Sequence, residues 1–375
     1  MRGGSWRMTL AVAALGLAGA AVEPARGAEA QQNWVALPAL GYSTDTAWMG
    51  GGVLMRLYGC SGEAAPAPTS APEPKLECSR SHLAGAVLYS QKHQLMLSLG
   101  GDNSWRGRCH RLVWGLKYRR FPSRFYGIGR TADLDEGYTP RQSTAELAYL
   151  RRLGGGWELG LAAALSRQYL ERDSLEPGGL LAARELVGSR FFVRTGVGPR
   201  LLLDRRDSPW QPRRGVYLSA GSTLYRRALG GDLNGERYSL DARSYWSPGA
   251  GLVIAAQVAL DDARGETPFD ALPSLGGDEE LRGYPGGRYR DRSRLLAQVE
   301  VRRPVLLGRL GLALFAGAGD VAPALGRLAP GQARLGGGGG LRYLYDPASG
   351  LTLRLDYGVG EGGESSVAIT LGEAF

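Results

Sequence analysis

The chain has 375 residues and a net charge of +9, from 45 Lys or Arg against 36 Asp or Glu. Its 58 glycines are about twice the usual share, and Tyr (17) and Trp (8) outnumber Phe (7). The arginines are spread along the whole chain between apolar residues. A clustered basic patch of the kind that binds nucleic acid is therefore excluded, and we expect no nucleic-acid partner.

The first thirty residues have the features of a secretory signal peptide. Arg2 and Arg7 precede an apolar run at 8–22, and residues 28–30 form an A-x-A cleavage site. A membrane anchor is the alternative, but an apolar run of about 15 residues is shorter than the roughly 20 that a spanning helix needs. We predict that residues 1–30 are removed and that 31–375 form the mature domain.

Two cysteines bracket a loop early in the mature chain. Cys60 and Cys78 flank the Pro/Ala-rich segment 61–74. A disulfide between them would close this loop and would be consistent with an oxidising compartment, which leaves Cys109 over. The alternative is three unpaired thiols, because an odd number of cysteines does not fix any pairing.

Alternation with a period of two dominates the remaining sequence. In segment 351–357 the odd positions are apolar, whereas Thr352, Arg354 and Asp356 are polar. Such alternation places one set of side chains on each face of a strand. Fifteen segments follow this pattern and a short one at 34–40 makes sixteen; fourteen is the alternative count. They span 34–40, 46–58, 80–91, 93–101, 108–120, 141–152, 156–170, 190–204, 215–227, 236–247, 251–262, 295–305, 311–320, 334–345, 350–358 and 366–375.

A soluble sandwich and a membrane barrel share this alternation, but with opposite faces turned to the solvent. After Val22 there is no uninterrupted apolar run of about 18 residues, so no helix is expected to span a bilayer. A membrane protein without such helices must be a closed barrel. With the signal peptide and aromatic residues near strand ends, such as Trp114 and Tyr357, we predict an all-β, transmembrane antiparallel β-barrel of the outer membrane.

The connections alternate between tight and long, as in bacterial outer-membrane barrels. Long loops are predicted at 121–140, 171–187 and 263–294, and a tight turn at 153–156. The long loops belong outside the cell and the short turns in the periplasm. Because arginines recur in the loops, we expect outer-membrane lipid and lipopolysaccharide among the partners.

A turn motif lies between two predicted strands, at 204–215. Pro212 and Gly215 would fix the turn, and Asp204 and Asp207 can pair with neighbouring arginines such as Arg206. A strand follows directly.

A second motif, Leu-Arg-Gly-Tyr at 281–284, lies in the longest late loop. Gly283 permits a sharp backbone turn before Tyr284, and Arg282 supplies a planar, always charged fork. A buried cation of this kind needs a carboxylate partner. Glu300 on the next predicted strand points to the polar face by parity and is the candidate.

Three more features lie toward the carboxyl end. Residues 315–319 read Phe-Ala-Gly-Ala-Gly, and five consecutive glycines occupy 336–340, where they would allow close packing within a strand. The last segment alternates and finishes on Phe375.

Four segments resemble the bacterial surface antigen family. They are the turn motif at 204–215, Leu-Arg-Gly-Tyr at 281–284, Phe-Tyr-Gly-Ile-Gly at 125–129 and the run from Gly336 to Leu355. Its barrels include outer-membrane protein assembly factors and two-partner secretion transporters, and the resemblance covers nearly all of 32–375. It implies a long loop folded into the lumen, with Arg282 held by Glu300, and Phe375 as the signal for the assembly machinery.

One departure from the family concerns the strand after Glu300. The family usually has Phe-x-Asp-x-Gly there, but here Gly317 replaces the acid, and Asp320 has the opposite parity. We therefore expect the loop attachment to be weakened, or carried by Glu300 alone.

The resemblance implies a barrel that assists insertion or translocation of protein, or of lipid, at the outer membrane, with a first-to-last strand seam that opens laterally. Relatives that assemble or secrete protein carry periplasmic repeat domains before the barrel. Here only a few residues separate Ala30 from the first predicted strand, so we expect no such domains. Substrate capture must then fall to a periplasmic partner, or the activity has been lost. A passive channel, or a structural barrel that binds a partner, is the alternative.

An enzyme is not expected. The three histidines, His82, His93 and His110, lack metal-ligand spacing, and no nucleophile or paired-carboxylate motif accompanies them. We accordingly expect no metal and no cofactor.

Overall fold

The computed structural model describes residues 33–58, 81–105, 109–131, 133–183, 185–209, 211–306, 309–346 and 351–375. The predicted signal peptide and the candidate disulfide between Cys60 and Cys78 lie outside these residues. Cys109 is described, and its exposed side chain is a free thiol.

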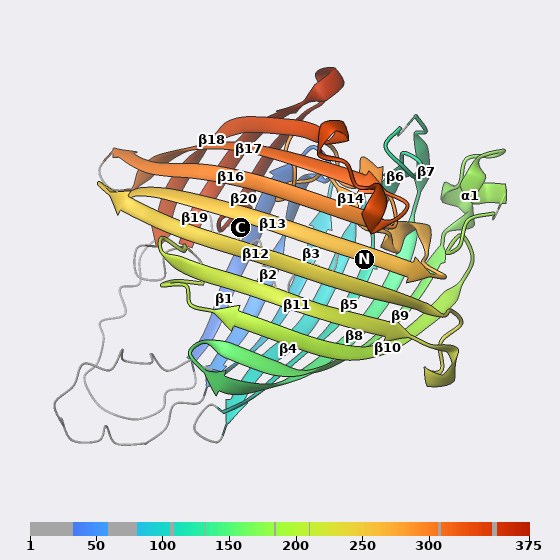
Figure 1. The fold of residues 1–375 in the computed structure, drawn as a ribbon, viewed down its shortest axis with the longest axis horizontal. Coiled ribbons are helices and arrows are strands. Elements are labelled where there is room, and N and C mark those ends of the chain that lie inside the picture. The colour runs from blue at the N-terminus through green and yellow to red at the C-terminus, as the bar shows by residue number, and fades with distance from the viewer. Residues whose placement is uncertain are drawn as a thin grey trace.

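Sixteen antiparallel strands of the described chain form a closed barrel in sequence order (Figure 1). Each of the sixteen segments predicted from alternation overlaps one of them, so the higher of the two strand counts is confirmed. The strands are β1 (Asn33–Ser43), β2 (Ala47–Tyr58), β3 (Ser81–Ser90), β4 (Leu95–Trp105), β5 (His110–Arg120), β8 (Pro140–Gly154), β9 (Trp157–Leu170), β10 (Phe192–Asp204), β11 (Gly215–Tyr225), β12 (Gly235–Gly249), β13 (Leu252–Gly265), β16 (Ser293–Leu306), β17 (Leu310–Ala322), β18 (Arg334–Asp346), β19 (Leu351–Gly360) and β20 (Ser365–Leu371).

The long connections gather at one end of the barrel, where Figure 1 shows the small elements β6, β7, α1 and β14 together. Tight turns such as 250–251, between β12 and β13, lie at the other end. None of the described helices is long and apolar enough to cross a membrane. The small elements are β6 (Ser123–Phe125), β7 (Glu136–Tyr138), α1 (Leu180–Ala183), β14 (Ser274–Leu275), β15 (Tyr289–Arg290) and the 3-10 turns η1 (Arg172–Ser174), η2 (Arg227–Leu229), η3 (Phe269–Ala271), η4 (Leu325–Arg327), η5 (Pro330–Gln332) and η6 (Glu361–Gly363).

The two faces of the wall differ as an outer-membrane barrel requires. On β16, Val299 and Val301 are exposed on the outside of the barrel. Glu300 and Arg302, which alternate with them, are buried. On β19, Tyr357 is 54% exposed, whereas Asp356 is 2% exposed. The apolar set therefore faces outward and the charged set lines the interior, which is the reverse of a soluble sandwich.

The seam between the first and last strands is the weakest join described in the wall. β1 has eleven residues, but only Tyr42 and Ser43 pair with β20, opposite Ile369 and Ala368. A backbone bond from Thr44 N–H to the Val367 carbonyl (3.1 Å) extends it by one step. By contrast, β19 and β20 pair over seven residues. Most of the outer edge of β1 in the described chain therefore lacks a ladder partner on the β20 side.

The short seam follows from an early end to the last strand. We predicted a strand over 366–375, but β20 ends at Leu371. Gly372 adopts φ +79°, a conformation that favours glycine, and its N–H donates to the Thr352 carbonyl (2.8 Å). The chain then enters the lumen, where Phe375 is fully buried against Tyr245 and Ala255. The predicted strand was therefore four residues too long.

Candidate functional site

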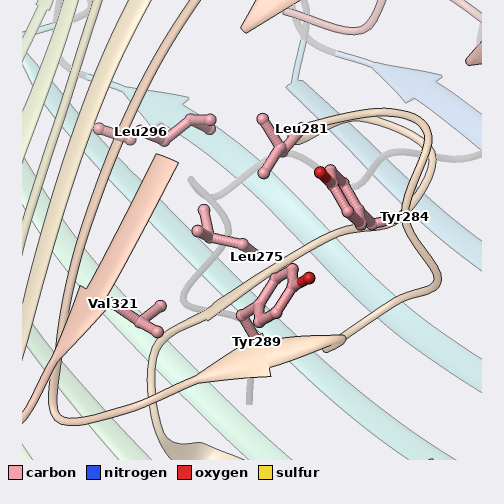
Figure 2. Close-up of a cluster of buried hydrophobic side chains, with 7 residues drawn as sticks. Leu275, Leu281, Tyr284, Tyr289, Leu296 and Val321 are labelled. Atoms are coloured by element: carbon pink, nitrogen blue, oxygen red, sulfur yellow. The ribbon is translucent and has the colours of Figure 1, made fainter. Parts of the chain in front are cut away.

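The loop between β13 and β16 returns into the barrel and packs on its inner wall. Figure 2 shows Leu275, Leu281, Tyr284 and Tyr289 of this loop with Leu296 and Val321 of the wall. Both Leu275 and Tyr284 are completely buried. A buried apolar cluster holds the loop as a packed element, so the lumenal loop inferred from the motif at 281–284 is present in the fold.

The guanidinium of Arg282 at the tip of this loop meets two carboxylates. Nη2 lies 2.5 Å from Glu300 Oε2 on β16, and Nη1 lies 2.6 Å from Asp356 Oδ2 on β19. The guanidinium carbon stands 3.5 Å from the centre of the Phe315 ring on β17. All three charged side chains are almost fully buried, so three wall strands hold one cation by charge and by its flat face.

The expectation that Glu300 would act alone is wrong. Asp356 supplies the second carboxylate that the family motif would place at Gly317. A Cβ at Gly317 would lie 3.1 Å from Gln298 Cβ and 3.5 Å from Leu281 Cδ1, so β17 packs closely at this point against the neighbouring strand β16 and the apolar part of the loop tip. Asp320 bonds instead to Arg130 of the 121–135 loop at 2.7 Å.

The Arg282 pairs belong to a larger buried network. Glu300 also accepts from Arg302 (2.7 Å) and Arg342 (3.0 Å), and Asp356 accepts from Arg342 at 2.6 Å. The network extends to the carboxyl end, because Arg342 donates to Glu373 at 2.8 Å. Removing one charge would leave its partners buried with fewer counter-charges, which costs more than breaking an exposed pair.

The glycine run of β18 forms the seat of the loop tip. A Cβ at Gly336 would lie 2.8 Å from the Arg282 carbonyl oxygen, and one at Gly338 would lie 2.8 Å from the Phe315 ring. On β19, a Cβ at Gly360 would lie 2.5 Å from the Tyr284 ring. Without side chains, these glycines let the loop tip and the Phe315 ring approach the backbone of β18 and β19 closely. The structure therefore supports the interpretation of segment 336–340 as a place of close packing.

The remaining motif residues at the tip bind the last strands. Gly283 has φ +115°, and its N–H donates to Ser366 Oγ on β20 (2.9 Å). The Tyr284 hydroxyl donates to the Leu335 carbonyl (2.7 Å) and accepts from Glu361 N–H (2.7 Å). The tip therefore fastens to the strands nearest the seam.

The same loop reaches both sides of the seam at its external end. Gly286 N–H donates to Asp45 Oδ2 (2.8 Å) in the β1–β2 turn. Arg288 Nε donates to Glu364 Oε1 (2.8 Å) in the β19–β20 turn. Sequence parity could not predict these contacts, because turn residues carry no strand period.

The turn motif lies away from this site, between β10 and β11. Asp204 accepts from Arg206 Nε at 2.8 Å, and Asp207 Oδ1 accepts from the backbone N–H of residues 213 and 214. Gly215 has φ +110°, and a Cβ there would overlap the Arg205 carbonyl. Pro212 is buried beside it. The motif thus builds the connection at 205–214, at the end opposite the long loops, and lies away from the lumenal loop.

A closed sixteen-stranded barrel, polar inside and apolar outside, with an external loop ion-paired to its lumenal wall, defines an outer-membrane β-barrel with a loop packed in its lumen. The chain belongs to the Omp85 superfamily, whose domain model matches residues 82–375. This match confirms the resemblance drawn from the motifs and the predicted outer-membrane location.

Several solved structures share the fold. BamA from Haemophilus ducreyi lacking POTRA domains 1-3 superposes with a TM-score of 0.62 at 12% identity, covering 91% of this chain and 70% of that one. CdiB from Acinetobacter baumannii gives 0.56 at 13% identity, and CdiB from Escherichia coli gives 0.57 at 12%. Each covers 91% of this chain, which spans 60% and 64% of the two CdiB chains. A search of curated protein sequences finds no match.

Metal chemistry has no support in the described residues. No group of three or more His, Cys, Asp or Glu side chains there could hold a metal ion.

Proposed function

We propose that this barrel assists the insertion or translocation of protein at the outer membrane by opening along the seam between β1 and β20. The observation that carries the proposal is the seam itself, where two residue pairs join the strands. Among the described residues, β1 before Tyr42 has no ladder partner on β20, and such a strand edge can template an incoming strand by β-augmentation. Lipid is the second substrate class that the same opening would admit.

The lumenal loop is proposed to control this opening. Its tip is ion-paired to β16 and β19, and its outer part bonds to the turns on both sides of the seam. With the loop in place, the external end of the seam is clasped. Displacing the loop would remove that clasp. In this proposal a periplasmic partner captures the substrate. No bond is made or broken in this mechanism, so we propose a protein without catalysis.

A covalent clamp tests the proposal. The substitutions Ser43→Cys and Ala368→Cys lie at positions paired across the seam. They would be combined in a variant without the native cysteines and oxidised to a disulfide. The control places cysteines at Val359 and Ser365, which are paired across the neighbouring β19–β20 hairpin. Proteoliposomes would be assayed for faster folding of a urea-denatured outer-membrane barrel.

We expect the seam clamp to abolish the acceleration, reduction to restore it, and the hairpin clamp to leave it unchanged. Full acceleration with the seam closed would refute the proposal. The alternative of a passive channel is separated by planar-bilayer recording, where steady large conductance of the wild-type protein would favour the channel.

A further inference from the structure

A groove of about 980 Å³ crosses the outer surface of the wall from β1 to β9. The strand register shows that outward-facing residues line it in two neighbouring rows. The first row passes from Leu97 to Tyr118, from Tyr118 to Ser143, and from Ser143 to Arg167. It thus runs from an apolar stretch to an exposed guanidinium that packs on the Phe191 ring at 5.8 Å.

The second row is apolar throughout this stretch. It passes from Leu99 to Leu116, then to Ala145 and Leu165, and the three leucines are 40–50% exposed. The small side chain of Ala145 leaves a recess between Leu116 and Leu165. Six strand spacings of about 4.8 Å give the groove a length of about 29 Å, so an extended acyl chain fits along it.

The β9 end of the groove lies beneath a basic cluster at the external end of the wall. Arg120 is paired with Arg141, and Arg141 with Tyr169, in the register directly above the Arg167 row. Both upper arginines bond to Glu171. Three guanidinium groups against one carboxylate leave a local excess of two positive charges.

The part of the wall from β11 to β13 provides a contrast at the same end of the barrel. There Arg226 pairs with Glu236 at 2.8 Å, and Arg264 pairs with Asp262 at 2.6 Å. Two cations and two carboxylates balance. The uncompensated charge above the groove is therefore a local property and not a general feature of the rim.

We propose that this face is a binding site for the lipid A part of lipopolysaccharide, a phosphorylated and multiply acylated glycolipid. Charge complementarity assigns the phosphate to Arg167 and Arg141, and the apolar rows assign an acyl chain to the groove. On β5, Tyr118 lies between Leu116 of the apolar row and Arg120 of the basic cluster, where an amphipathic ring suits a headgroup boundary. The site does not depend on the proposed function, because it lies on the lipid-facing side of the wall.

Binding of diphosphorylated lipid A to the full chain in detergent micelles, followed by native mass spectrometry, tests the site. Arg167→Gln should weaken binding about tenfold or more, as expected for the loss of one charged hydrogen bond. Arg264→Gln on the balanced wall is the matched control and should change nothing. Glu171→Gln should strengthen binding, because it raises the positive excess.

Two further measurements separate the parts of the ligand. Ala145→Phe, which fills the recess, should weaken binding of phosphorylated and dephosphorylated lipid A alike. Dephosphorylated lipid A should be insensitive to Arg167→Gln. Every variant should keep the heat-modifiable mobility of a folded barrel, since these side chains lie on the exterior. Equal losses in Arg167→Gln and Arg264→Gln, or displacement of the lipid by inorganic phosphate, would overturn the proposal.

Discussion

Asp356→Asn isolates the carboxylate that the sequence motif did not reveal. The substitution preserves volume but removes a charge bonded to Arg282 and Arg342, each at 2.6 Å. The new amide nitrogen is a hydrogen-bond donor, and it would face the N–H donors of the Arg282 and Arg342 guanidinium groups. Because all of these groups are buried, breaking the pairs should lower the free energy of unfolding by about 3–5 kcal/mol.

The matched control is Asp135→Asn. Asp135 pairs with Arg124 at the same kind of distance, 2.7 Å, but the two side chains are 58% and 56% exposed. An exposed pair of this kind contributes about 0–1 kcal/mol. Urea titration of the folded barrel in lipid vesicles, read by tryptophan fluorescence, measures both losses.

A double substitution completes the test. In Arg282→Met with Asp356→Asn, one cation and one anion leave together, so the combined loss should fall below the sum of the single losses by about 0.5–3 kcal/mol. If Asp356→Asn costs no more than Asp135→Asn, or if the losses add, the buried network does not hold the loop and the reasoning fails.

Three further outcomes follow from the same contacts. Arg288→Gln, which removes the bond to Glu364, should increase amide hydrogen exchange at 39–43, whereas unchanged exchange would argue against a clasp. Phe375→Ala should cost about 3–5 kcal/mol in the same urea titration, because the ring is fully buried; a loss below about 1 kcal/mol would mean that the terminal segment leaves the lumen. The Arg120 guanidinium bonded to Glu171 holds the pKa of that carboxyl below its ordinary 4.5. The folded pKa is depressed, so this contribution is complete above pH 4.5 and is lost as pH falls through the lower value; protease sensitivity of the 171–191 loop should rise there in the wild type but not in Glu171→Gln.

Strand positions and faces could be predicted because both depend on a local period. Residues such as Val299 and Glu300 alternate on every strand, and in lipid the alternation must separate outside from inside. The pairing of Arg282 with Glu300 was also accessible, since the loop returns directly into the next strand. Here the local chain and the motif point to the same geometry.

The second carboxylate was beyond such reasoning. Asp356 is 74 residues from Arg282 in sequence, and barrel closure alone brings them together. The alternation on β19 predicted that the Asp356 side chain faces the lumen, but it gave no information on which residue Asp356 binds. The end of β20 was missed for a different reason, because Ala374 and Phe375 keep the apolar character of a strand while Gly372 turns the backbone away.

The loop between β13 and β16 both attaches to the lumenal wall and holds the seam between β1 and β20 closed. Gly283 of the tip bonds to Ser366 on β20 (2.9 Å), and Gly286, three residues later, bonds to Asp45 beside β1 (2.8 Å). Because the intervening chain is short, the tip cannot leave its seat without straining the bond to Asp45. A change that weakens the Arg282 pairs should therefore loosen the seam as well. Asp356→Asn should raise hydrogen exchange at 39–43, although β19 is not a neighbour of β1 in the barrel, whereas Asp135→Asn should not. Unaltered exchange in Asp356→Asn would show that the loop and the seam act independently.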